Sequence, residues 1–293
     1  MKTTRFLFPL LWAILSIFGV NAQDVAEEDL PVVPYFQSKM FNAPVLDGWE
    51  NQSTENIAQF YLADAQATIR TAVVNNGDSA VGAKQDLETF LGTTLDEPIY
   101  SEKVNLADGT WVVLVYQVDE NTTASAMARQ NDGRSYVVSF IESNPNVSVY
   151  MATIAHTDDS DENNPILEIG TAIETFTSAS IDDLSDPEIV ILPTGEWTQQ
   201  TNGDNVTGLG WIFGNDSYLA VADGAIDNLP ELANAYNTTL LGFFITPDNG
   251  HYLILGLVIS LGTLIILALS IILRARGLQK DLAVIQQLTQ DDD

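Results

Sequence analysis

The residues best suited to hold a metal ion lie in one acidic stretch, Asp159-Ser-Asp161-Glu-Asn163. Asp159, Asp161 and Asn163 alternate along the chain, and carboxylate and amide oxygens on a tight loop are the ligands that Ca²⁺ prefers. The stretch departs from an EF-hand loop, because Asn164 stands where that loop needs glycine and Gly170 where it needs a bidentate glutamate. Two interpretations stay open: a Ca²⁺ site formed by these three residues, or a solvated acidic loop that caps the next helix.

A second set of residues has types that nucleophilic catalysis requires. Gly77-Asp78-Ser79 follows an expected strand and precedes an expected helix, and Asp248-Asn-Gly-His251 has DxxH spacing. The two motifs resemble those of the GDSL/SGNH hydrolases, which implies Ser79 as nucleophile, His251 as base and Asp248 as its partner. The leucine of the family motif is absent and its GxND block is one residue out of pattern. The alternative is that Ser79 caps the helix, and we assign no catalytic residue.

The composition limits the other chemistry that the chain can carry. It has no Cys, and only two His, so thiolate metal sites and disulfides are excluded and a multi-His metal site is not expected. With 11 Lys and Arg against 40 Asp and Glu, the formal net charge is −29. Such a surface repels nucleic acid and anionic lipid headgroups. Two interpretations of the charge stay open: it serves solubility or a salty habitat, or it attracts cations or basic partners.

An uncharged apolar stretch near the C-terminus determines where the protein resides. Tyr252 to Leu273 is long enough, as a helix, to cross the hydrocarbon core of a bilayer. Arg274, Arg276 and Lys280 follow it at once, so the positive-inside rule places the tail 274–293 in the cytoplasm. We expect a single-pass protein of the plasma membrane with its N-terminal part outside the cell.

The transmembrane stretch also carries a signal for helix pairing. Gly256 and Ser260 have small-xxx-small spacing, which lets two helices approach closely. A homo-oligomer formed through this helix is therefore one expectation for the partners, beside the membrane itself and an unidentified protein partner.

The N-terminal end reads as a targeting signal. Residues 1–22 have a basic start, an apolar middle and small or short residues at the end, which is typical of a signal peptide cleaved before Gln23. Residues 23–35 form an acidic, Pro-containing leader. Beyond it, six Asn-x-Ser/Thr sequons are candidates for glycosylation: Asn51, Asn121, Asn146, Asn205, Asn215 and Asn237.

The elements that must position these residues follow from the apolar pattern. Short β-rich runs are expected over 41–45 and 65–74, and four consecutive antiparallel strands over 110–118, 124–129, 135–141 and 148–154. Asn131-Asp132-Gly133 predicts a hairpin between two of them. Apolar residues at helical spacing predict helices near 80–91, ended by Gly92, and from Pro165 to Phe176.

The second half of this region repeats features of the first. Gly109-Thr-Trp111 is echoed by Gly195-Glu-Trp197, and a Ser-Tyr pair at 135–136 is echoed at 217–218. We interpret this as a degenerate repeat of a strand-strand-strand-helix unit, against the alternative of chance similarity between β-rich segments. It predicts an α+β fold, with antiparallel sheet layered against helices, divided into 36–180 and a smaller partial copy over 187–247.

The order of the expected elements resembles that of a known fold. These elements are Pro44 to Trp49, the extended strand that reaches Val74, the helix near 80–91, the meandering strands and the closing helix. Over 36–180 this order resembles the PsbP-like α/β/α sandwich. The resemblance implies a binding or assembly module more often than an enzyme. We therefore expect a membrane-anchored, non-enzymatic binding or scaffolding ectodomain with no cofactor. The alternatives are a Ca²⁺-stabilised adhesion ectodomain and a serine hydrolase.

Overall fold

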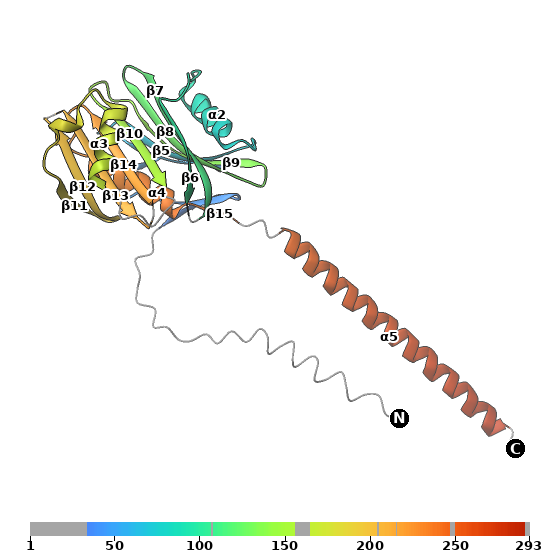
Figure 1. Cartoon of the computed structure of the whole chain (residues 1–293). Coiled ribbons are helices and arrows are strands. Elements are labelled where there is room, and N and C mark those ends of the chain that lie inside the picture. The colour runs from blue at the N-terminus through green and yellow to red at the C-terminus, as the bar shows by residue number, and fades with distance from the viewer. Residues whose placement is uncertain are drawn as a thin grey trace. The chain divides into compact units, whose positions relative to one another are not determined.

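A computed structural model describes residues 34–106, 108–155, 165–203, 205–214, 216–246 and 250–290. Residues 35–246 form an α+β domain with antiparallel sheets and helices (Figure 1). Its strands are β1 (Tyr35–Gln37), β2 (Phe41–Pro44), β3 (Glu50–Asn51), β4 (Ala58–Leu62), β5 (Ala67–Val74), β6 (Tyr100–Leu106), β7 (Gly109–Asp119), β8 (Thr122–Asn131), β9 (Arg134–Glu142), β10 (Ser148–Ala155), β11 (Glu188–Leu192), β12 (Gly195–Asn202), β13 (Val206–Phe213), β14 (Asp216–Asp223) and β15 (Phe244–Ile245). Its helices are α2 (Ser79–Leu91), α3 (Pro165–Phe176), the 3-10 turn η1 (Ile181–Asp183) and α4 (Leu229–Gly242).

The two large sheets have the same strand order. The seven-stranded sheet contains β5-β9-β8-β7-β6, preceded at its edge by β3-β4, and the five-stranded sheet runs β10-β14-β13-β12-β11. In each sheet a first strand leads into a helix, then into a four-strand meander whose last strand pairs antiparallel with the first. The chain therefore contains two copies of one β-α-β-β-β-β unit. The first unit is β5 to β9 and the second unit is β10 to β14.

The two copies confirm the expected repeat, but the repeating unit begins and ends at other elements than expected. The echoed Gly-x-Trp motifs begin β7 and β12, and the echoed Ser-Tyr pairs begin β9 and β14. The helix of each unit, however, precedes the meander and does not close it. The expected run of four consecutive neighbouring strands is wrong at its last member, because β10 leaves β9 and pairs with β14. Segments 36–180 and 187–247 thus share one sheet and one core.

The outer faces of the two sheets are covered by the helices of their own units. α2 packs on β5, β7, β8 and β9, where Ala83 and Leu87 are buried one helical turn apart. α3 packs on β12, β13 and β14 (Figure 1). Here β13 carries Gly208 and Gly210, and a Cβ on either residue would lie 2.5 Å or 2.8 Å from Ile169. Glycine at these positions lets the helix approach the sheet.

The expected helix near 80–91 is confirmed, with a different cap. The side chain of Asp78 accepts hydrogen bonds from the N–H groups of Ala80 and Val81, at 3.0 and 3.1 Å. Ser79 is the first helical residue and not the cap. Gly92 ends the helix with φ of +69°, a left-handed conformation that favours glycine. The buried pair of Arg70 on β5 and Asp86, with nitrogen and oxygen 3.0 Å apart, fastens the helix to the sheet.

The third helix, α4, lies between the two sheets. It contacts β5 and β9 of the first unit and β11, β13 and β14 of the second. Its buried residues share one apolar core with the inner faces of both sheets: Leu229, Leu232, Ala233, Ala235, Tyr236 and Leu240. Away from α4 the two sheets meet directly, where Thr123 on β8 donates to the Val149 carbonyl on β10 at 2.7 Å. The layers are therefore α2, first sheet, α4, second sheet, α3.

After β15 the chain forms one long helix, α5 (Gly250–Gln290). Its segment Ile254–Gln279, with mean hydropathy 2.7, has the length and composition of a membrane-spanning helix. The hydroxyl of Ser260 donates to the carbonyl of Gly256 at 2.8 Å, so it is satisfied within the helix. The predicted membrane association is thereby supported by a single C-terminal apolar helix.

A buried carboxylic acid stands at the crossing from the first sheet to the second. Glu142, at the end of β9, is 1% exposed and accepts from the Asn144 N–H at 2.6 Å. Its second oxygen has no hydrogen-bond partner among the described residues. Burial raises the pKa of Glu142 from 4.5 to about 8, although the N–H groups of Asn144 and Val149 lower it.

This environment predicts a stability that falls as pH rises. The folded protein keeps Glu142 protonated above pH 4.5, where the unfolded chain ionises, so stability is lost progressively between pH 4.5 and about 8. At about 1.4 kcal/mol per pKa unit, the shift of the Glu142 pKa corresponds to a loss on the order of 5 kcal/mol. Thermal melts of the full chain should show this slope, and Glu142→Gln should remove it. Exposed Glu50→Gln should keep it, and equal slopes in wild type and Glu142→Gln would contradict the assignment.

Candidate functional site

The sequence-predicted metal site lies outside the described residues. Asp159, Asp161 and Asn163 belong to 156–164, between β10 and α3. Within the parts of the chain that the structure describes, no group of three or more His, Asp or Glu residues is arranged to hold a metal ion. Calcium binding by the acidic loop stays a prediction.

The residues of the hydrolase interpretation are only partly placed. Ser79 is half-buried at the start of α2 and lines an open groove with Glu102, Lys103 and Gln130. His251 is in the first turn of α5, but its side chain is outside the described part of the structure, as is all of Asp248. The hydrolase interpretation stays untested.

Five of the six sequon asparagines fall within the described structure. Asn51, Asn121, Asn146 and Asn205 are exposed. Asn237 lies on α4 between the sheets, is 2% exposed, and donates to the carbonyl of Ala233 at 2.9 Å. The folded domain therefore offers the four exposed positions to a modifying enzyme and conceals Asn237.

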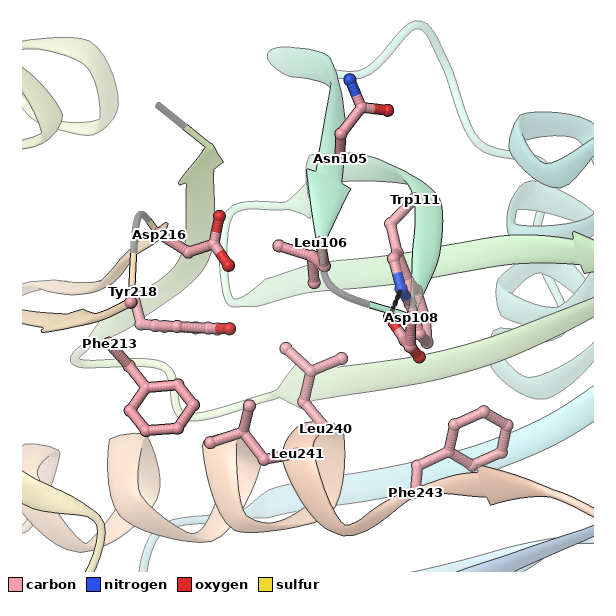
Figure 2. A pocket seen from close by; sticks show the side chains of 11 residues that line it. Asn105, Leu106, Asp108, Trp111, Phe213, Asp216, Tyr218, Leu240, Leu241 and Phe243 are labelled. Atoms are coloured by element: carbon pink, nitrogen blue, oxygen red, sulfur yellow. Dashed lines mark hydrogen bonds between the residues drawn. The ribbon is translucent and has the colours of Figure 1, made fainter. Parts of the chain in front are cut away.

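A cavity of about 690 Å³ opens where the two units and the end of α4 meet. Three segments enclose it: the β6–β7 connection of the first unit, the β13–β14 connection of the second, and the last turn of α4 (Figure 2). Its described lining is mainly apolar and aromatic, and four of its side chains are polar: Asn105, Asp108, Asp216 and Tyr218. The other lining residues are Leu106, Trp111, Phe213, Gly214, Leu240, Leu241 and Phe243. This composition, apolar walls with few polar groups, is typical of small-ligand sites.

The polar wall on the first unit is fixed by three side chains. The indole N–H of Trp111 donates to Asp108 at 2.8 Å, as Figure 2 shows. Arg129 on β8 forms an ion pair with the same carboxylate at 2.8 Å and also donates to the Asp108 backbone carbonyl. Its guanidinium lies over the ring of Trp111, 5.2 Å from the centroid, and 6.0 Å from that of Phe243. The carboxylate of Asp108 is thus held in place by an indole and a guanidinium.

In the second unit, the residue equivalent to Trp111 is Trp197, and its neighbours are aromatic. Trp197 donates to the hydroxyl of Thr194, three residues earlier, at 3.0 Å, just as Trp111 donates to Asp108. In the first unit, Arg129 lies opposite Tyr136 on the neighbouring strand. Tyr218 is the equivalent of Tyr136 in the second unit, and the residue opposite it is Trp211. Trp211 stacks on Trp197 with centroids 5.5 Å apart. A stacked indole in the second unit therefore replaces the guanidinium of the first.

The electrostatics of the cavity differ between its two sides. Burial raises the pKa of Tyr218, and the negative charges of Asp216 and Asp108 raise it further, so the phenol stays neutral and can donate a hydrogen bond. Asp216 and Tyr218 point toward the same space in Figure 2. The described lining includes no Ser, Cys, Lys or His. What the cavity offers is a neutral donor, two carboxylates and an amide around an apolar floor.

No sequence pattern predicts this site. Trp111 and Tyr218 stand out as repeat anchors, whereas Asp108, Arg129, Asp216 and the end of α4 belong to no motif. The signal available was the echoed Gly-x-Trp and Ser-Tyr motifs, because both pairs point into the shared core. Comparison of this chain with protein-family models and with curated proteins found no match.

Removing Arg129 tests whether the wall of the cavity depends on this cation. Arg129→Ala should lower the free energy of unfolding by about 1–3 kcal/mol, since it removes the stack over Trp111 and leaves Asp108 unpaired. Half of the Asp108 side chain is exposed, so solvent screens the ion pair and packing supplies most of the loss. Denaturation followed by tryptophan fluorescence measures it. Lys103→Ala, at an exposed site on β6, should change little, and an equal change in both variants would refute the role.

Proposed function

We propose that this protein is a single-pass, membrane-anchored binding protein whose α+β domain lies outside the cytoplasm and holds a small ligand in the cavity between its two units. The observation that supports binding is the cavity itself, because it is enclosed by parts of both units and joins an apolar floor to a few fixed polar groups. The resemblance of 36–180 to PsbP-like domains agrees with a binding role by analogy only.

The chemistry of the lining suggests the kind of ligand. Leu106, Leu240, Leu241 and Phe213 offer contact to an apolar body. On the polar side, Asp108 is already paired with Arg129, whereas the phenol of Tyr218 is neutral and available to donate. The ligand that fits is a largely apolar molecule with one group that accepts from Tyr218 or donates to a carboxylate.

Filling the cavity tests this proposal. Leu241→Trp places an indole in the cavity, whereas Ile99→Trp adds the same group at a site of similar exposure outside it. In native mass spectra of the full chain purified from cells, wild type and Ile99→Trp should carry a small bound molecule that Leu241→Trp loses. An adduct of unchanged occupancy in Leu241→Trp, or no adduct in any preparation, would contradict the proposal.

The topology rests on the charge asymmetry around α5. Arg274 and Arg276 follow the apolar span, whereas residues 232–251 contain no Lys or Arg. Because the chain has no Cys, single cysteines report the side directly. A membrane-impermeant maleimide should label Asn121→Cys on intact cells and Gln279→Cys only after permeabilisation. The opposite pattern would place the domain in the cytoplasm.

A further inference from the structure

The two ends of the sheets differ in the side chains that they expose. At one end lie the β6–β7 and β13–β14 connections, the end of α4 and β15. The exposed large side chains there include Tyr35, Phe213, Leu241 and Phe244, which we call the apolar rim, and Ile191 on the edge strand β11 is also exposed near this end. At the other end are the β7–β8 and β12–β13 connections, which carry the exposed Asn121 and Asn205.

The members of the apolar rim fall into two pairs at this end of the domain. The rings of Tyr35 and Phe244 are 5.6 Å apart. Leu241 and Phe213 both line the cavity, from the end of α4 and from the end of β13 (Figure 2). Gly242 joins the two pairs, because a Cβ there would lie 3.7 Å from the Tyr35 hydroxyl. Each side chain is 40% to 54% exposed, which is costly for four neighbouring apolar groups in water unless something covers them.

The chain itself determines what lies near this surface. β15 ends at Ile245, α5 begins at Gly250, and the apolar span begins at Ile254. Five residues at up to about 3.6 Å each and four helical residues at about 1.5 Å each allow a separation between Ile245 and Ile254 of roughly 24 Å at most. The chain therefore keeps Phe244 and Ile245, at this end of the domain, within that distance of the start of the span, and it sets a wider limit for the far end of β14.

We infer that the apolar rim docks on the surface of the bilayer into which α5 inserts, so that the cavity opens against the lipid. Aromatic and leucine side chains are those that enter the interfacial region of a membrane. The tether holds the rim at high effective concentration beside the lipid, so a small apolar contact suffices. The net negative charge of the chain makes zwitterionic lipid the favoured surface, since anionic headgroups repel it. This inference depends on α5 spanning the membrane and not on the ligand of the cavity.

The absence of Cys allows each position to carry one fluorophore in the full chain. Phe213→Cys, Leu241→Cys and Phe244→Cys are labelled with nitrobenzoxadiazole and placed in phosphatidylcholine nanodiscs. Ile99→Cys is the matched control, because Ile99 and Phe244 have the same exposed fraction, 48%. Ile99 lies beside Val115, toward the far end of β7. Thermal melts identify any variant that fails to fold, and the remaining rim positions then carry the test.

Lipids with a doxyl group in the acyl chain should quench the three rim labels and shift their emission to shorter wavelength, while aqueous iodide quenches the Ile99 label. A flexible insertion of 20 residues after Pro247 should reduce the lipid quenching at the rim. Rim labels open to iodide as fully as Ile99 would overturn the inference. So would labels shielded from both quenchers, which indicates a protein contact, or quenching that requires anionic lipid, which indicates charge attraction.

Discussion

One helix covers two sheets, and the rest of the domain depends on that packing. Both sheets have apolar inner faces, and neither can bury its inner face with the outer helix of its own unit. α4 fills the space with Leu232, Tyr236 and Leu240, and each fully buried side chain of this kind contributes about 1.5–3 kcal/mol. The cavity lies where this helix ends, and Leu240, Leu241 and Phe243 line it there.

The two halves of the domain repeat one topology, but they are chemically unequal. The same indole hydrogen bond to a residue three positions earlier occurs in both units. In the first unit Arg129 covers the indole of Trp111 and forms an ion pair with Asp108. In the second unit Trp211 covers the indole of Trp197. The two units therefore support the cavity differently: an ion pair stands behind its lining in the first unit and a stacked indole pair in the second. A symmetric dimer of one unit would not provide this combination.

The domain is also polarised along its strands. The end that continues into α5 exposes aromatic and aliphatic side chains, and the opposite end exposes Asn121, Asn146 and Asn205 on its turns and connections. Glu142, the buried acid, stands toward that opposite end, where the chain crosses from one sheet to the other. The cavity and the buried acid thus lie in separate places, joined by the shared core.

Local chemistry determined much of this protein from the sequence alone. The uncharged span, the helix from Ser79 with Gly92 after it, the Asn131-Asp132-Gly133 hairpin and the repeat anchors all depend on neighbours within a few residues. Both φ values in that hairpin are positive, +51° and +73°, as a type I′ turn requires.

Only the tertiary structure decided how these elements combine. β10 is apolar on both faces, and nothing in its pattern tells whether β9 or β14 is its neighbour. Likewise α4 has the pattern of an ordinary helix, and its burial between two sheets follows from the closure of both units around it. Asp108, Arg129 and Asp216 meet at the cavity because of these long-range pairings. Their spacing in the sequence carries no period from which the site could be inferred, since non-local packing and not local propensity brings them together.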